Sequence, residues 1–187
     1  MLVDFCSMTE EQLRYPLGRF DLERTDWQLE ELLEAVLHIQ SLPEELSRLL
    51  QGLEPAALNN TYRPGSWTAL QVIHHLADSH LNAWVRTKLI LTEEEPVIKP
   101  YEEELWAQGD DYGYSYEASF MVLLGLHQRW SLLLLQCLKK PELLFRGMQH
   151  PQLGRRISLA QLIAMYGWHS RHHLMHLKIA LGHASNG

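Results

Sequence analysis

The fold is decided first by residues 158–181, which read SLAQLIAMYGWHSRHHLMHLKIAL. Ser158 followed three residues later by Gln161 is a capping-box pattern, which marks the beginning of a helix. Gly182 then follows the expected end of that helix. Between these points apolar residues recur at steps of three and four on one face: Leu159, Leu162, Tyr166, Leu177 and Ala180. The stretch therefore predicts an amphipathic helix with one buried side.

Three other stretches show the same helical spacing of apolar residues. They are residues 25–51, where Pro43 is expected to kink the helix, residues 68–92, which open on a second capping box, and residues 116–138, which end before Pro141. Four long helices with mostly short or medium connections predict an all-α four-helix bundle.

The segments between the helices carry two weaker signals. Residues 97–116 form a long connection rich in aromatic residues, with one helical turn expected near residues 102–106. A connection of this length in a compact domain usually shapes a site or an interface. A short pair of strands is expected on either side of Leu153 and Gly154.

Length and composition limit the classes of protein that the chain can belong to. With 187 residues and 46% hydrophobic content, we expect one domain spanning residues 1–187. Such a domain buries enough surface to fold without a metal or disulfides, so any bound metal is expected to be functional. The net charge of -7 argues against nucleic acids and anionic membranes as partners, because both attract basic surfaces.

The cysteines and the apolar runs bear on the cellular location. Only Cys6 and Cys137 are present, far apart in the sequence, which excludes a disulfide framework and favours a reducing compartment. The amino end has no basic segment ahead of an apolar stretch, and the longest apolar run, Leu132–Leu135, is far below the ~18 residues of a membrane span. We expect a soluble cytoplasmic protein.

The 11 histidines are the informative part of the composition, because many of them cluster. His169 and His173 lie four residues apart within the apolar stripe of residues 158–181, whereas His172 points away from it and His176 lies near its edge. Imidazoles on an apolar face need partners, and two of them one turn apart can bind the same cation. The two clusters contain His74, His75 and His80, and His169, His172, His173 and His176.

The helix predicted over residues 68–92 is harder to interpret. His74 shares a stripe with apolar residues, whereas His75 shares one with Gln71, Asp78 and Asn82. Periodicity alone would bury His74 and leave His75 on a polar strip. That strip would be either solvated surface or the wall of a wet cavity, and the spacing leaves both alternatives open.

Two histidines from one helix and one from another would form a three-imidazole metal site with an open coordination position, which is the catalytic type. Such an ion lowers the pKa of a bound water toward ~7. The last helix reads HSRHH where zinc metalloproteases read HExxH, so a general base must come from elsewhere. Asp78 is a candidate base or a partner that orients a ligand imidazole. An exposed carboxylate without either role is an equally good interpretation of this residue.

Two segments together point to a known family. Residues 62–107, YRPGSWTALQVIHHLADSHLNAWVRTKLILTEEEPVIKPYEEELWA, and residues 166–177, YGWHSRHHLMHL, resemble the YfiT-like branch of the DinB superfamily, described as metal-dependent hydrolases. The resemblance extends from about Tyr15 to Leu177. It implies a four-helix bundle, a homodimer, and one divalent ion, zinc or nickel, held by His75, His169 and His173.

The resemblance leaves the reaction open. Some relatives are thiol S-transferases, which join a low-molecular-weight thiol such as bacillithiol, mycothiol or glutathione to an electrophile, and a non-catalytic metal-binding stress-response protein is a further alternative. In each enzymatic case the substrate is a small molecule, and an open-site ion activates water or a thiol. Candidates for the substrate-binding wall are Tyr101, Trp106, Tyr112 and Tyr114, with Arg63 and Trp67.

Overall fold

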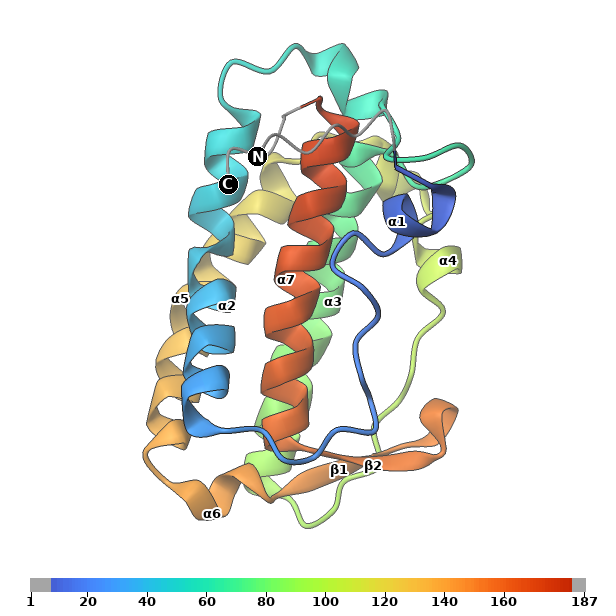
Figure 1. The fold of residues 1–187 in the computed structure, drawn as a ribbon. Helices are drawn as coiled ribbons and strands as arrows, with labels where there is room; N and C mark the ends of the chain where they lie inside the picture. The colour runs from blue at the N-terminus through green and yellow to red at the C-terminus, as the bar shows by residue number, and fades with distance from the viewer. Residues whose placement is uncertain (1–7, 183–187) are drawn as a thin grey trace.

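The computed structural model describes residues 8–182, and its architecture is a four-helix bundle, as predicted. The bundle helices are α2 (Leu29–Leu50), α3 (Ala69–Thr92), α5 (Glu117–Leu138) and α7 (Leu159–Ala180) (Figure 1). The remaining elements are short: α1 (Glu10–Arg14), η2 (Pro55–Asn59), α4 (Glu103–Trp106), η3 (Asp110–Gly113), α6 (Pro141–Leu144), β1 (Gly147–His150), η4 (Pro151–Leu153) and β2 (Arg155–Ser158).

The packing of the bundle brings α3 and α7 together along their lengths. Helix α2 packs mainly against α5 and α7, and α3 packs mainly against the same two helices, so α2 and α3 lie on a diagonal. The inner faces supply a core of large apolar side chains that includes Leu32, Ile39, Ile90, Trp130, Leu134 and Leu162. One histidine cluster lies on α3 and the other on α7, and these two helices contact each other.

The two predicted capping boxes are confirmed, and they mark the starts of α3 and α7. At the start of α3 the Gln71 N–H donates to the Thr68 hydroxyl (3.2 Å), and the Thr68 N–H donates to the Gln71 side chain (3.0 Å). Ser158 and Gln161 form the same pair at the start of α7 (3.1 and 3.0 Å). Each pair satisfies two N–H groups that would otherwise lack partners.

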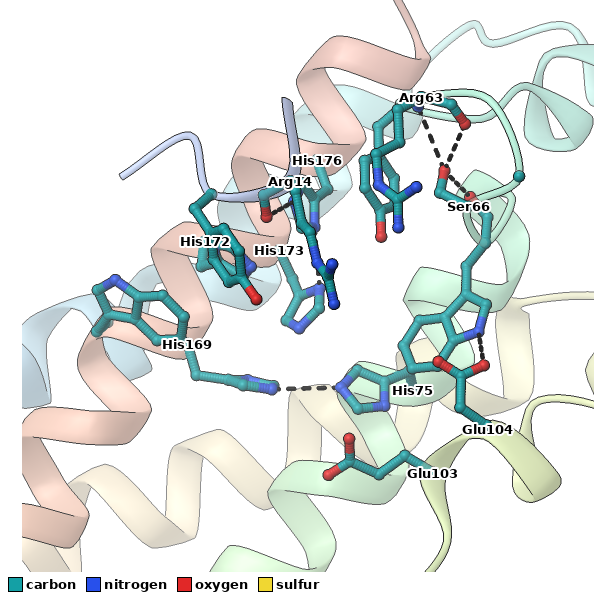
Figure 2. Close-up of a pocket in the computed structure, with 15 residues that line it drawn as sticks. Arg14, Arg63, Ser66, His75, Glu103, Glu104, His169, His172, His173 and His176 are labelled. Carbon is teal, nitrogen blue, oxygen red and sulfur yellow. Dashed lines mark hydrogen bonds between the residues drawn. The ribbon is translucent and has the colours of Figure 1, made fainter. Parts of the chain in front are cut away.

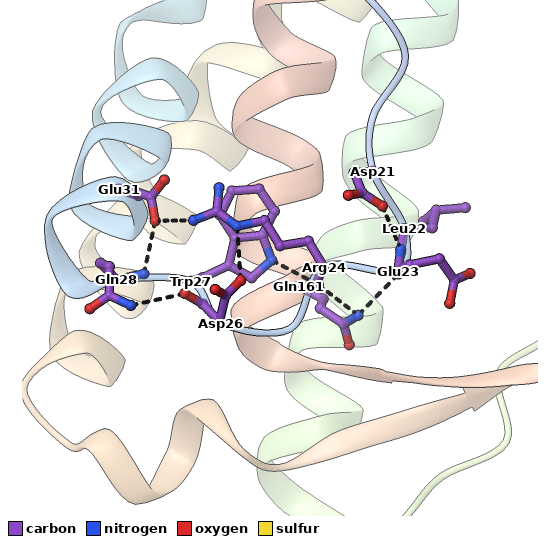
Figure 3. A network of polar contacts seen from close by, with 9 residues as sticks. All are labelled: Asp21, Leu22, Glu23, Arg24, Asp26, Trp27, Gln28, Glu31 and Gln161. Atoms are coloured by element: carbon purple, nitrogen blue, oxygen red, sulfur yellow. Dashed lines mark hydrogen bonds and ion pairs between the residues drawn. The ribbon is translucent and has the colours of Figure 1, made fainter.

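Helix α2 starts at Leu29, later than the Thr25 expected from the sequence, because a polar network holds the preceding residues in an extended path (Figure 3). Arg24 pairs with Glu31 in the first turn of α2 (2.7 Å). The Gln161 side chain donates to the carbonyls of Leu22 and Arg24 (both 3.2 Å). The network ties the segment after α1 to the starts of α2 and α7. The helix then runs through Pro43 without interruption.

The expected strand pair around Leu153 and Gly154 is also present. Strands β1 and β2 pair antiparallel, with the buried side chains of Met148 and Ile157 opposite each other. Gly154 has a φ of 62° in the turn, a conformation that glycine adopts without strain. Ser158 ends β2 and caps α7, so the hairpin leads directly into the helix that carries His169.

Helix α5 is long and apolar enough to cross a membrane by length and composition alone, and 28% of that apolar stretch is buried. In the bundle it contributes Leu123, Trp130 and Leu134 to the core. Met121 and Leu132 remain exposed on its outer face. A single helix of this kind is weak evidence for a membrane span, because core helices of bundles have the same composition.

The close contact between α2 and α7 depends on Gly167. A Cβ atom at this position would lie 2.5 Å from Ala35 Cβ and 2.6 Å from Ala35 Cα. We expect Gly167→Ala to lower the free energy of unfolding by about 1–3 kcal/mol, because the overlap outweighs the roughly 1 kcal/mol that alanine gains in a helix. Urea denaturation measures the change.

Gly125 in α5 provides the matched control. A Cβ atom there would meet nothing within 4 Å. Gly125→Ala should therefore leave stability unchanged or raise it by up to about 1 kcal/mol. Equal stabilities of the two alanine variants would contradict the close contact at Gly167.

Candidate metal centre

Three imidazoles meet between α3 and α7. His75 comes from α3, and His169 and His173 come from adjacent turns of α7 (Figure 2). One nitrogen from each ring lies within 4.8 Å of the others, and the Nε2 atoms of His75 and His169 are 3.3 Å apart. His75 and His173 are buried, and His169 is partly buried. The structure thus brings together His169 and His173, which the helical spacing indicated, and His75, which the family resemblance implied.

The donor set fits a divalent ion such as zinc or nickel. Two nitrogens bound tetrahedrally to zinc at 2.0–2.1 Å are about 3.3–3.4 Å apart, which matches the separation of His75 and His169. Burial lowers the pKa of His75 to about 4 and the pKa values of His169 and His173 well below 6.5. All three rings are therefore neutral at pH 7 and have a lone pair to offer.

His74 is buried as the periodicity predicted, but it lies outside the cluster. Its Nδ1 is 2.7 Å from the Ser119 hydroxyl, and its Nε2 donates to the Tyr114 carbonyl (3.1 Å). Both ring nitrogens are thus held by the first turn of α5 and the segment before it. His75 therefore supplies the α3 nitrogen of the cluster.

The polar strip of α3 is covered by the connection between α3 and α5. The Gln71 side chain donates to the Ala107 carbonyl (3.0 Å), and the Tyr112 hydroxyl donates to the Asp78 carboxylate (2.7 Å). The polar strip consists of Gln71, His75, Asp78 and Asn82, and only His75 of these four lines the pocket that contains the three imidazoles. Asp78 is thus bonded to Tyr112 and does not line that pocket.

A chain of hydrogen bonds extends from the cluster into the core. His169 Nδ1 is 3.0 Å from His80 Nε2, and His80 Nδ1 is 2.8 Å from His127 Nε2. His127 Nδ1 in turn contacts the carbonyl oxygen of Ile39. The chain therefore joins α7, α3, α5 and α2.

The carbonyl at its end gives this chain a direction. A carbonyl oxygen only accepts, so His127 Nδ1–H donates to Ile39, and a neutral His127 ring must accept at Nε2 from His80. By the same logic His169 Nδ1–H donates to His80 Nε2. This arrangement leaves the Nε2 lone pair of His169 directed at the cluster, which is the tautomer that a metal ligand needs.

His173 is oriented in a similar way by His176. The Nε2–H of His176 donates to the Arg14 carbonyl (3.2 Å), which leaves its Nδ1 as an acceptor 3.4 Å from His173 Nδ1. The sequence did not indicate that His80, His127 or His176 orient the ligands. His80 and His127 follow the buried stripes of their helices, so periodicity could have placed them in the core, but it could not show that they meet.

The cluster opens into a pocket of about 290 Å³. Of the predicted wall, Arg63 and Trp67 do line it, and the Trp67 ring lies 4.7 Å from the His75 ring. The pocket lining contains none of the four aromatic residues expected from the connection: Tyr101, Trp106, Tyr112 and Tyr114. Glu103 and Glu104 of the same connection line it instead, together with residues from other segments: Arg14, Tyr15 and Tyr62.

A family model described as the DinB superfamily matches residues 38–177, which include all three imidazoles. The chain belongs to the DinB superfamily. This finding confirms the resemblance recognised in the sequence.

Proteins similar to this DinB chain carry names that refer to a metal. A Bacillus cereus protein named "Putative metal-dependent hydrolase" is 41% identical over 166 residues, covering 88% of this chain and 93% of its own. An Oceanobacillus iheyensis protein with a similar name is 42% identical over 166 residues, which again cover 88% of this chain and 93% of the relative. The solved structure of YfiT from Bacillus subtilis, described as a probable metal-dependent hydrolase with an unusual four-helix bundle topology, matches with a TM-score of 0.83. That match has 35% identity and covers 91% of this chain and 98% of YfiT.

The histidine chain predicts a variant with altered metal affinity. His80→Phe keeps a ring in place but removes the acceptor for His169 Nδ1–H. We expect it to weaken Zn²⁺ binding by about 10–100-fold, the usual effect of losing a partner of a metal-bound histidine. Competition with a chelating dye measures the affinity, and ¹⁵N NMR of the metal-free protein reports the His169 tautomer.

His74→Phe is the matched control, because it removes another buried, hydrogen-bonded histidine of α3 that does not contact the cluster. Its Zn²⁺ affinity should equal that of the wild type. If both variants lost affinity equally, the effect would come from a general loosening of α3.

Proposed function

We propose that this protein is a metal-dependent hydrolase in which His75, His169 and His173 hold one divalent ion, zinc or nickel. The observation that carries the proposal is the convergence of three neutral imidazoles at an open pocket. When bound, such an ion would lower the pKa of a water toward ~7 and supply a nucleophile at neutral pH. The names of the similar proteins support the same class of activity.

The proposal assigns the role of proton acceptor to Glu103. Its side chain lines the pocket, and Figure 2 shows its carboxylate beside the pair formed by His75 and His169. Loss of surrounding water raises the pKa of Glu103 above its ordinary value, which brings it nearer to the value that a general base needs at neutral pH. Asp78, the candidate from the sequence, is bonded to Tyr112 and does not line the pocket.

A thiol S-transferase is the second candidate, favoured by the absence of a glutamate next to the histidine ligands on α7. In that reaction the thiol proton passes to the base, and the sulfur attacks an electrophilic carbon. The leaving group departs with the electrons of the bond that breaks. The same pocket would activate the thiol, because a nearby cation favours the thiolate.

The test starts with elemental analysis of protein purified without added metal. Zinc- and nickel-loaded protein is then assayed on a panel of small esters and amides, and on pairs of small thiols with alkyl halide electrophiles. We expect turnover on the hydrolysis panel that disappears in His173→Ala. Turnover on the thiol panel alone would favour the transferase, and a loaded protein inactive on both panels would favour the non-catalytic metal-binding alternative.

The role of Glu103 is tested by Glu103→Gln, which should lower turnover by about 100-fold, within the usual range for loss of a general base, and leave metal content unchanged. Asp78→Asn is the control, because that carboxylate is outside the pocket. A greater loss in Asp78→Asn than in Glu103→Gln would overturn the assignment.

A further inference from the structure

The pocket above the three imidazoles carries two guanidinium groups, although the protein as a whole has a net charge of -7. Arg14 ends α1, and Arg63 lies in the loop before α3. Figure 2 shows both on the opposite side of the pocket from Glu103 and Glu104, with the Arg14 side chain extending toward His173. The pocket is therefore divided into a basic side and an acidic side.

The basic side has unused hydrogen-bonding capacity. The Arg63 Nε atom is buried without a partner, and among the described residues this guanidinium forms an ion pair only with the exposed carboxylate of Glu10, at 3.6 Å. Within residues 8–182, Arg14 forms no ion pair with a carboxylate. His172, which lines the same pocket and is 6% exposed, also has a buried Nδ1 without a partner.

Unpaired buried N–H groups carry a free-energy penalty, which a bound acceptor removes. Guanidinium groups match the geometry of anionic oxygens, which accept two parallel hydrogen bonds. A pocket of about 290 Å³ is at the lower end of the range for small-molecule sites. The facing carboxylates of Glu103 and Glu104 repel a doubly charged group, which favours a singly charged anion such as a carboxylate.

We propose that Arg14 and Arg63 bind a carboxylate of the substrate, which places its reactive group over the three imidazoles. The substrate class is thus a small molecule with a free carboxylate. This inference rests on the proposed function for the position of the reacting group, but the binding of the carboxylate can be measured separately.

The test uses two thiols that differ only in the carboxylate: 3-mercaptopropionate and its amide, 3-mercaptopropanamide. Each is titrated into cobalt-loaded protein, where a thiol that reaches the ion changes the visible spectrum. We expect the acid to bind at least tenfold more tightly than the amide in the wild type. In the double variant Arg14→Gln/Arg63→Gln the two affinities should become equal through weaker binding of the acid.

Arg171→Gln is the matched control, since it removes one positive charge from an exposed position of α7 that does not line this pocket. It should keep the preference for the acid. The two single variants are measured beside the double variant, and circular dichroism checks the folding of each. Equal affinities of acid and amide in the wild type, or an equal loss of preference in Arg171→Gln, would overturn the proposal.

Failure of the metal site would have a different signature. If the protein bound no cobalt, the proposed function would fail, and the anion site would be tested in metal-free protein. Trp67 and Trp168 line the pocket, so their fluorescence reports binding of propionate against propionamide. A response to propionate that is absent in the double variant supports the carboxylate site, and no response in the wild type refutes it.

Discussion

His173→Ala should bind Zn²⁺ at least 100-fold more weakly than the wild type and keep its helical fold. The substitution removes one of three imidazole ligands, and a 100-fold loss corresponds to about 2.7 kcal/mol of binding free energy. The fold should survive because the apolar core of α2, α3, α5 and α7 supplies its stability. Chelator competition measures the affinity, and far-ultraviolet circular dichroism measures the helical content.

His172→Ala is the control on the neighbouring position. His172 stacks on Trp168, with ring centroids 4.3 Å apart, and is not one of the three converging imidazoles. Its alanine variant should keep near-native Zn²⁺ affinity. Equal losses in both variants would mean that the rotation of α7 differs from the one described, and global unfolding of His173→Ala would mean that the ion holds the fold together.

The metal-free protein should lose stability steeply as the pH falls from about 6.5 to 4. Burial lowers the pKa of His127 to about 4, whereas an unfolded histidine has a pKa of about 6.5. Between these values the unfolded chain binds a proton that the folded chain does not, so acid favours unfolding. The stabilisation is fully present above pH 6.5 and is lost at about 1.4 kcal/mol per pH unit, about 3 kcal/mol in all for this residue.

Urea denaturation of metal-free protein across this pH range measures the slope. His127→Gln should flatten it by about one proton, since glutamine does not titrate. A slope that His127→Gln leaves unaltered would show that His127 has the same pKa in the folded and unfolded states.

The helices and two of the three candidate ligands could be predicted from the sequence, because both depend on residues that lie within one or two helical turns of each other. Capping pairs such as Ser158 with Gln161 act within one turn, and the spacing of His169 and His173 places them on one face of any helix. His75 could not be chosen over His74 from periodicity. Its burial depends on how residues 97–116 fold over the polar strip of α3, which is a tertiary contact.

The same connection explains the other differences between expectation and structure. The Tyr112 hydroxyl holds Asp78, and Tyr114 holds His74 through its carbonyl, so these aromatic residues cover α3 from outside the pocket. The hydrogen bond from His80 to His127 joins residues 47 positions apart. Short-range sequence patterns cannot show such a pairing. The spacing of apolar residues can only indicate that each of the two histidines lies on the buried face of its own helix.

Because the hydrogen-bond chain of the histidines joins all four long helices, binding of the proposed ion would report on assembly of the entire bundle. A chain still emerging from the ribosome without α7 has one of the three imidazoles, His75, because the other two belong to α7. Tight capture of the ion during biosynthesis would thus be restricted to molecules that have finished folding. Partly made chains would compete poorly for scarce metal in the cell.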